Sequence, residues 1–534
     1  MDSIFDRALS EIGQDGRFQK MFDIIYNVVL SILWTMAYMN LMLALIIVPY
    51  TCHIPGKPND VSELSWRQLN IPVYTNAAGE VKFHNCLMYT NYSLHNNTKV
   101  CDTYDYDKTW YERTVPTENN WVCDKELYVA NILASSKIGE LVGSIAFGWY
   151  GDTYGRRPTY IISLLLIIFG RAVSLLAGTS FILFVFGTVV AALPSWSVLQ
   201  SVTAISMEIS SPTNRTLTAS LRFAGWSVGL AATALLFWCL RDWKIFFIAT
   251  TATQVPFLLF SWKMIESPRW LWVQGKTKEC VKYLKYIAKK NNKNLSKETE
   301  EEILTYTPVK NTHGLGYLAL FSGWTLAKNT ILQLIAWICY STSYTVILMS
   351  SGEKTDGNPF LESVWQSLAE LPGYFIAAWL ADRIGRRYTG AISFGITAAM
   401  WTVLALRENS SNVVFRNSLV GSTLAVINRM SATISYSIIT IFNMELYPTC
   451  IRQSGMSLGN LFISAGSALA PYMLYLGRRY SQLSNLILIG ISLFGIICIV
   501  LLPETLNEKL PETIEDAQAF GKKKLKYLPV SSQS

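Results

Sequence analysis

The sequence predicts an all-α membrane protein with twelve transmembrane helices, divided into two pseudo-symmetric six-helix bundles, and with a disulfide-bonded extracellular loop domain. Long apolar segments, one polar segment with several cysteines and an internal repeat predict this class. Only 15% of the 534 residues are charged, against about 25% in a typical soluble protein. A transmembrane helix needs roughly 20 apolar residues. Segments with few or no charges occupy 22–50, 159–170, 173–193, 223–240, 245–261, 388–406 and 483–502.

The chain begins with a polar segment, 1–21, that has no apolar signal-peptide core. We therefore expect a cytosolic N-terminus and a first span over 22–50. The polar segment 51–126 is then extracellular, where disulfides form. It contains sequons at Asn91 and Asn96 and four cysteines that permit three pairings, namely Cys52, Cys86, Cys101 and Cys123. A metal site is the weaker interpretation, because no CxxC pair is present.

Further spans alternate in direction. The N-terminal half, 22–263, continues with spans near 127–147, 158–177, 180–205, 216–238 and 244–263. A charged, helix-prone segment, 264–325, is expected to form a cytosolic linker with short helices. The C-terminal half, 326–502, has spans near 327–350, 359–381, 388–406, 415–442, 453–476 and 483–502, and the polar tail 503–534 is cytosolic. Lysine and arginine cluster in the segments assigned to the cytosol, so the net charge of +8 does not indicate nucleic-acid binding.

An internal repeat relates the two halves. Gly148-Trp-Tyr-Gly-Asp152-Thr-Tyr-Gly155-Arg156-Arg157 recurs in the second half as Ala378-Trp-Leu-Ala-Asp382-Arg-Ile-Gly385-Arg386-Arg387. Glu208 and Arg215 recur with the same spacing as Glu445 and Arg452, and Glu266 recurs as Glu504. Three ordered matches at almost one offset indicate a duplicated six-helix unit.

These motifs, together with Glu266-Ser-Pro-Arg-Trp270, Glu445-Leu-Tyr-Pro-Thr449 and Leu502-Pro-Glu-Thr505, resemble those of the major facilitator superfamily. Sugar porters share several of them, but the long loop with its cysteines resembles the organic cation/anion/carnitine transporter family, solute carrier family 22. The resemblance covers nearly the whole chain. It implies the major facilitator fold and a plasma-membrane transporter of small organic ions that works by alternating access. The extracellular loop is also a candidate contact for a homo-oligomer.

The chain departs from the family pattern. Similar transporters usually have an arginine midway along the fourth helix, where this chain has Thr188, and their loop often has six cysteines instead of four. Ser464 stands at the eleventh-helix position that is aspartate in cation transporters and arginine in anion transporters. Motifs at 448–456 look like the anion branch and motifs at 470–477 like the carnitine branch. The sign of the substrate charge therefore stays open.

Ionisable residues inside spans are costly, so each needs a partner or a function. Glu140 and Glu370 are repeat-equivalent, since each lies twelve residues before the aspartate of the repeated motif, or about 18 Å along a helix. Glu370 is therefore a candidate contact for a cationic substrate. Glu140 could have the same role, or Lys137 on the same helix face could neutralise it. Arg171 is expected to pack against neighbouring helices.

Two further arginines complicate a purely cationic site. Arg222 could bind substrate, but snorkelling or locking of the inner gate is the favoured interpretation. Arg429 could pair with a substrate carboxylate or balance Glu370. A site with both signs would suit a zwitterion such as a carnitine-like betaine. Aromatic rings attract organic ammonium groups. Trp337, Tyr340 and Tyr344 share one face of the seventh span and are therefore candidate substrate contacts, with Trp196 a weaker candidate. Alternatively, these aromatic residues only pack against neighbouring helices or lie at the membrane interface.

The charges near the repeated turns are assigned to gating, because equivalent positions would let the halves exchange salt bridges as the cavity opens. They are Asp152, Arg156, Arg157, Glu208, Arg215, Asp382, Arg386, Arg387, Glu445 and Arg452. We expect facilitated transport or exchange of organic cations or zwitterions. The alternative is an organic anion exchanger; a sugar-type porter or a non-transporting receptor is disfavoured. No motif of an enzyme, metal site or cofactor site is present.

Overall fold

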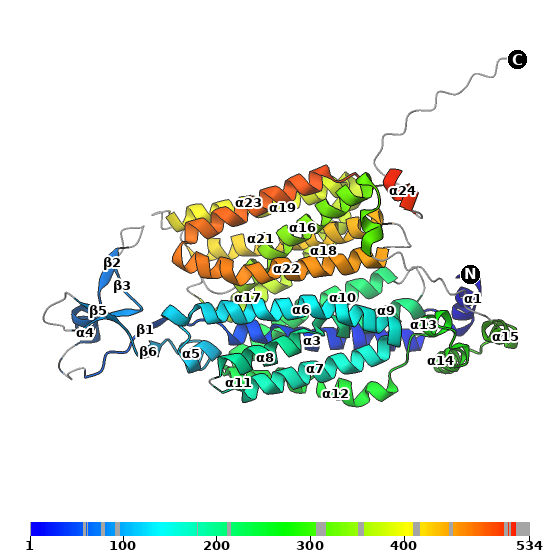
Figure 1. Cartoon of the computed structure of the whole chain (residues 1–534), viewed down its shortest axis with the longest axis horizontal. Helices are drawn as coiled ribbons and strands as arrows, with labels where there is room; N and C mark the ends of the chain where they lie inside the picture. Colours follow the sequence, from blue (N-terminus) through cyan, green and yellow to red (C-terminus); the bar gives the residue numbers. More distant parts are fainter. Residues whose placement is uncertain are drawn as a thin grey trace, which may run out of the picture.

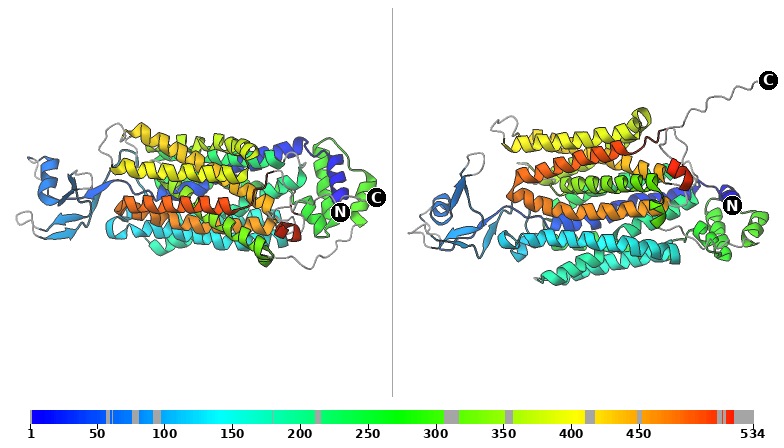
Figure 2. Two further views of the ribbon diagram at one scale, coloured as in Figure 1. Left: turned by 90° about the horizontal axis from the view of Figure 1, so that it is seen from above. Right: turned by 45° about the horizontal axis from the view of Figure 1, so that its top comes forward.

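The computed structural model describes residues 2–56, 60, 62–75, 81–90, 97–178, 180–210, 215–305, 317–350, 357–409, 417–447, 452–506, 511 and 514–519. Its long helices run along one axis in two bundles, which Figure 1 shows one above the other. A small domain with strands lies at one end of the bundles and short helices lie at the other (Figures 1 and 2). We call these two ends the loop end and the linker end.

The first bundle is the N-terminal half. Its helices are α2 (Arg17–Phe22), the π-helix η1 (Asp23–Val29), α3 (Leu30–Ala44), α6 (Leu127–Tyr154), α7 (Arg156–Leu176), α8 (Phe181–Ala192), α9 (Ser195–Ile209), α10 (Arg215–Leu240), α11 (Trp243–Ala252), α12 (Val255–Leu259) and η3 (Phe260–Lys263). The segments α2–η1–α3, α8–α9 and α11–α12–η3 each correspond to one predicted span. The first span ends at Ala44, earlier than predicted, because the chain turns into the loop domain there.

The second bundle is the C-terminal half. Its helices are α16 (Trp324–Met349), α17 (Pro359–Leu368), α18 (Glu370–Ile384), α19 (Arg386–Asn409), α21 (Ser418–Leu446), α22 (Arg452–Arg479) and α23 (Ser481–Leu501). The two halves meet where α6 packs against α22 and α10 packs against α17. The helices at this interface are therefore those expected to border a central cavity.

Nine helical segments in the described part of the chain are long and apolar enough to cross a membrane. α6, the broken pair α17–α18 and α22 do not meet that criterion, yet they run parallel to the others in the bundles (Figure 1). α6 and α18 carry ionisable residues, and α22 is rich in glycine and serine. The structure is thus consistent with the twelve predicted spans.

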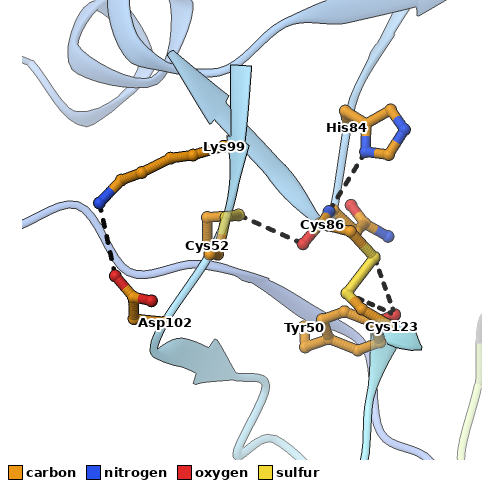
Figure 3. Close-up of a disulfide and its surroundings, with 9 residues drawn as sticks. Tyr50, Cys52, His84, Cys86, Lys99, Asp102 and Cys123 are labelled. Carbon is orange, nitrogen blue, oxygen red and sulfur yellow. Dashed lines mark hydrogen bonds and ion pairs between the residues drawn. A yellow bond between two sulfur atoms is a disulfide. The ribbon is translucent and has the colours of Figure 1, made fainter. Parts of the chain in front are cut away.

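The loop domain contains short antiparallel strand pairs. In its described part β1 (Tyr50–Cys52) pairs with β6 (Tyr104–Tyr106), β2 (Val73–Thr75) with β3 (Val81–Phe83), and β4 (Leu87–Tyr89) with β5 (Thr98–Val100). Helices α4 (Glu63–Asn70) and α5 (Val115–Asn119) and the short 3-10 turn η2 (Cys123–Lys125) complete it. Of the three possible cysteine pairings, the structure has Cys52–Cys101 and Cys86–Cys123, the latter beside Tyr50 (Figure 3). The sequons at Asn91 and Asn96 lie outside the described residues.

Polar contacts fix the loop domain to the N-terminal half. Arg113 Nε donates to Asp242 Oδ2 at 2.8 Å, and this hydrogen bond with the aspartate raises the pKa of Arg113. Asp242 also accepts the Lys244 backbone N–H at 2.7 Å and so caps α11. On the other side, the ring of Tyr111 lies 5.2 Å from that of Phe360 in α17. The loop domain therefore touches both halves.

Short helices cover the linker end. They are α1 (Asp2–Ile12), α13 (Pro268–Val273), α14 (Thr277–Lys290), α15 (Lys297–Thr305), the 3-10 helix η4 (Tyr317–Phe321) and α24 (Ile514–Ala519). Short helices were predicted in the linker, but α1 was not recognised in the polar N-terminal segment. Its Phe5, Leu9 and Ile12 are buried in the same cluster as Trp272 and Leu284 of the linker helices. The apolar face of α1 is narrow, which hid it in a polar segment.

Candidate functional site

A fully buried ion pair lies at the interface between the halves. Glu370, at the start of α18, accepts a hydrogen bond from Arg429 Nε of α21 at 2.8 Å, and the two side chains are 0% and 1% exposed. The Tyr344 hydroxyl of α16 donates to the same carboxylate at 2.8 Å. Ser227 of α10, in the opposite half, donates to its second oxygen at 3.1 Å. We call these four residues the Glu370 centre.

A second buried carboxylate lies in the N-terminal half. Glu140 of α6 pairs with Lys137 one turn earlier at 3.0 Å. The Tyr38 hydroxyl of α3 donates to Glu140 at 3.0 Å, and the indole N–H of Trp196 in α9 donates to it as well. Ser464 of α22, in the opposite half, donates to Glu140 at 3.1 Å. These five residues form the Glu140 centre, and here Lys137 does neutralise the glutamate.

The two centres are related by the repeat. Each glutamate accepts a hydrogen bond from a tyrosine of the first helix of its own half and from a serine of the opposite half. Tyr38 and Tyr344 lie further apart in the chain than other repeat-equivalent residues, because the loop domain is inserted between them. Ser227 and Ser464 are separated by the same offset as Glu208 and Glu445. Neither Tyr38 nor Ser227 was predicted, although the repeat offset from Ser464 points to Ser227.

Aromatic side chains surround both centres. Beside Glu140, rings with centroids 4.9–6.1 Å apart form a cluster of Trp34, Tyr38, Trp196 and Trp226. Beside Glu370, centroids 5.4–6.1 Å apart connect Trp337, Tyr340, Tyr344 and Tyr436. The Trp226 indole N–H donates to the Tyr344 hydroxyl at 3.4 Å and joins the clusters. The stripe predicted on the seventh span therefore lies at the interface, where ring faces can meet a cation.

The remaining arginines differ in their surroundings. Arg171 Nη2 donates to the Ala37 carbonyl at 3.3 Å and its guanidinium lies 5.3 Å from the Phe247 ring, so it packs against neighbouring helices as expected. Arg222 of α10 lies near the interface and has no carboxylate within ion-pair distance among the described residues. Thr188, at the position where the resemblance led us to expect arginine, is buried and donates to the Val185 carbonyl within its own helix.

A cavity of ≈ 100 Å³ lies between the Glu370 centre and the loop end. Its walls are mostly apolar and come from both halves, with Leu133 and Met349 among them, and Arg429 contributes to its lining. At the loop end an ion pair from Arg478 to Glu126, at 3.0 Å, joins α22 to the start of α6 across the two halves. This pair was not predicted, because each residue lies at a helix end where charges are common.

At the linker end the repeated charges form equivalent clusters. Arg156 lies 3.2 Å from Asp152 and 3.7 Å from Glu208. Arg386 has the repeat-equivalent partners in the other half: it lies 3.4 Å from Asp382 and 3.1 Å from Glu445. These ion pairs join helices of one half, whereas exchange between the halves was expected, so the described contacts give no support to that exchange. The side chains of Arg215 and Arg452 lie outside the described residues.

The second repeated glutamate caps a helix in each half. Glu266 accepts the backbone N–H groups of Arg156 and Arg157, both at 3.0 Å, at the start of α7. Glu504 accepts those of Arg386 and Arg387, at 2.9 and 3.0 Å, at the start of α19. Burial raises the pKa of Glu266, while these N–H donors partly oppose the rise. Arg157 and Arg387 thus contribute backbone donors to a cap, in addition to their charge.

One further acid was not predicted. Asp23 opens the π-helix η1 and accepts hydrogen bonds from Asn27, at 2.8 Å, and from Ser206 of α9. Thr203 donates to the Asn27 side chain at 3.1 Å. No role was assigned to Asp23 from the sequence. Among the described residues no cluster of His, Cys, Asp or Glu has the composition to hold a metal ion.

Comparison with known proteins identifies the class. Residues 85–517 match the family model "Sugar (and other) transporter". The chain therefore belongs to this family of membrane transporters. A partially occluded inward-open structure of the xylose transporter XylE from E. coli has a TM-score of 0.57 at 14% identity, over 72% of this chain and 90% of that one, which shows the shared fold.

The relatives identify the branch. "Organic cation transporter protein" of Drosophila melanogaster is 28% identical over 97% of this chain and 95% of its own length. "Solute carrier family 22 member 16" of Xenopus laevis is 30% identical, over 78% and 73%. "Beta-alanine transporter" of Drosophila melanogaster is 27% identical, over 78% and 68%. The chain is a member of solute carrier family 22, as its motifs predicted.

Proposed function

We propose that the chain transports small organic ions by alternating access and prefers carnitine-like zwitterions, with organic cations as the next class. The observation that carries the proposal is the Glu370–Arg429 pair, buried at the interface of the halves beside a cavity whose lining includes Arg429. It offers one carboxylate and one guanidinium to a molecule in that position. Ring faces of Tyr344 and Tyr340 lie beside it.

Charge balance favours a zwitterion. Removing one partner from a buried ion pair costs about 3–5 kcal/mol, because the other charge is left uncompensated. A substrate with an ammonium and a carboxylate can meet both Glu370 and Arg429 and keep the site neutral. A simple cation adds a net charge to a region where charges are costly. The names of the relatives support a choice between cations and zwitterions. One relative is named an organic cation transporter, one is named as a member of solute carrier family 22, and one is named for β-alanine, which carries both an ammonium and a carboxylate.

Organic anions are the second candidate. Glu140 is paired with Lys137 and Glu370 with Arg429. Arg222 lies near the same interface and has no ion-pair partner among the described residues. An anionic substrate could neutralise it. This alternative predicts that Arg222→Gln abolishes uptake, whereas a snorkelling role for Arg222 predicts retained uptake.

The orientation belongs to the same proposal. Disulfides in the loop domain favour an oxidising compartment, and basic residues concentrate at the linker end. We therefore assign the loop end to the cell exterior, both termini to the cytosol and the protein to the plasma membrane. With that orientation, the linker-end charge clusters lie on the cytosolic side, where each joins helices of one half.

Uptake in expressing cells tests the proposal. Labelled carnitine, β-alanine, tetraethylammonium and an organic dicarboxylate would be compared for wild type, Glu370→Gln, Arg429→Gln and the double variant, with Glu362→Gln as a control carboxylate. Surface biotinylation corrects for folding. Each single variant should lose zwitterion uptake, and the double variant should recover surface level without recovering uptake. Undiminished uptake by Glu370→Gln, or uptake of the dicarboxylate alone by wild type, would overturn the zwitterion assignment.

A further inference from the structure

The two buried glutamates are each held by one serine from the opposite half. Ser227 of α10 donates to Glu370 at 3.1 Å, and Ser464 of α22 donates to Glu140 at 3.1 Å. The tyrosine and the basic residue that bind each carboxylate come from its own half. When the halves separate at this level, the serine hydrogen bonds break while the ion pairs can stay intact.

The serine pair is symmetric in sequence as well as in space. Ser227 lies twelve residues after Arg215 and Ser464 twelve residues after Arg452, so both stand at the same height in repeat-equivalent helices. Both are buried at the interface, with exposures of 0% and 1%. Through these two hydroxyls, hydrogen bonds of the chain itself join the halves at both carboxylates.

We propose that Ser227 and Ser464 are positioning residues that stabilise the two carboxylates, in place of the positive charge of a substrate, while the carrier changes sides without cargo. A buried carboxylate that loses a hydrogen bond is destabilised. The closed state of an unloaded carrier therefore needs a donor from the opposite half, and each serine supplies one. In the loaded carrier the positive charge of the substrate at the interface compensates the carboxylates, so the serine hydrogen bonds contribute little to that step. The inference rests on the proposed transport function.

The consequence is a specific kinetic split. Net uptake requires the carrier to return unloaded, whereas exchange of internal for external substrate requires only loaded transitions. Ser227→Ala and Ser464→Ala should each slow net uptake about tenfold or more, the loss expected for one hydrogen bond to a charged group. Exchange should change less than twofold. A merely structural role for the serines would lower both processes together.

The experiment uses the full chain in proteoliposomes with labelled carnitine, or with whichever zwitterion of the uptake panel wild type transports best. Net uptake into vesicles without internal substrate is compared with uptake into vesicles preloaded with the unlabelled compound. Ser467→Ala is the matched control, because Ser467 is one turn further along α22 and bonds Thr345 within its own half at 3.0 Å. Ser227→Thr and Ser464→Thr keep the hydroxyl and should restore net uptake.

The outcomes separate the two proposals. A lowered ratio of net uptake to exchange in both alanine variants, with wild-type ratios in Ser467→Ala and the threonine variants, supports the inference. Equal loss of net uptake and exchange, or an unchanged ratio, overturns it while leaving the transport function in place. Absence of any flux from wild type in either vesicle type overturns the transport proposal itself. Exchange also reports folding, since an unfolded variant supports neither process.

Discussion

Glycine in the repeated motif is explained by backbone angle and by the glutamate cap. Gly155 has φ +112° and a Cβ there would lie 2.5 Å from Glu266 Oε2; Gly385 has φ +93° and its Cβ would lie 2.6 Å from Glu504 Oε2. Alanine at either position should lower the free energy of unfolding by about 1–3 kcal/mol. Thermal unfolding of purified protein in detergent measures this. Gly148→Ala, where nothing lies within 4 Å of the added Cβ, should cause no loss; equal stability of the variants would refute the explanation.

Lys137 is the cationic partner of the buried carboxylate in the Glu140 centre. Its Nζ lies 3.0 Å from the carboxylate and 4.6 Å from the centroid of the Tyr38 ring. In Lys137→Gln the carboxylate keeps its donors from Tyr38, Trp196 and Ser464, and a substrate cation can complete the pair. We expect KM for tetraethylammonium to fall about tenfold, the scale of a desolvated cation–π contact with a carboxylate beside it. Uptake kinetics measure this, with exposed Lys125→Gln as control. An unchanged or higher KM contradicts the assignment.

At the scale of helices, the sequence predicted the spans where apolar length alone decides. α7, α19 and α23 are examples, because lipid contact requires a continuous apolar surface. α6, α17–α18 and α22 are too polar for that criterion, and they were placed by the alternating direction of successive spans. Their polarity has a physical reason in the two interface helices α6 and α22 and in α18, which carry Glu140, Ser464 and Glu370 toward the other half. The small helix α1 escaped prediction because its burial depends on the linker helices.

The docking of α1 depends on Asn291 at the end of α14. Its amide donates to the carbonyls of Ile12 and Gly13 at 3.0 and 3.1 Å, and its oxygen accepts the Phe18 N–H at 2.9 Å. Asn291→Ala removes the side-chain partner of the Ile12 carbonyl and of the Phe18 N–H, whereas Gln19 still donates to the Gly13 carbonyl. A buried group left unsatisfied costs about 1–3 kcal/mol. Hydrogen exchange of residues 2–12 should then become faster by about tenfold or more. Asn294→Ala, an exposed neighbour, should leave exchange unchanged. Equal protection in both variants would show that apolar burial alone holds α1.

At the scale of the whole molecule, the sequence predicted which residues matter better than how they pair. The repeat identified Glu140 and Glu370 as equivalent, and hydropathy marked Arg429 as intramembrane. For Arg429 the sequence left two partners open, Glu370 or a substrate carboxylate, and the packing of α18 against α21 shows the pair with Glu370. The same limit applies to the disulfides and to the serines that cross the interface. Pairing is a tertiary property, and one sequence contains no record of contacts between distant segments.

Closure at the loop end depends on a contact between the halves. The Arg478–Glu126 pair spans the interface above the cavity, with side chains 33% and 18% exposed. A partly exposed ion pair contributes about 0.2–1 kcal/mol, so its loss should shift the open population by up to about fivefold. A cysteine introduced by Met349→Cys lies on the cavity wall. The exposed free cysteine Cys239 is replaced by Ala so that it does not react. The rate at which the new cysteine reacts with a membrane-impermeant thiol reagent, added at the loop side, then measures the opening.

Glu126→Gln and Arg478→Gln should each raise that reaction rate, and the charge exchange Glu126→Arg with Arg478→Glu should return it to the starting value. The swapped charges should restore the contact because the attraction across the interface requires only opposite charges, whichever half carries the positive one. High salt should raise the starting rate and reduce the difference between variants, because screening weakens an exposed pair. Equal rates in all variants, or a charge exchange that behaves like the single variants, would show that the apolar cavity walls alone close the loop end.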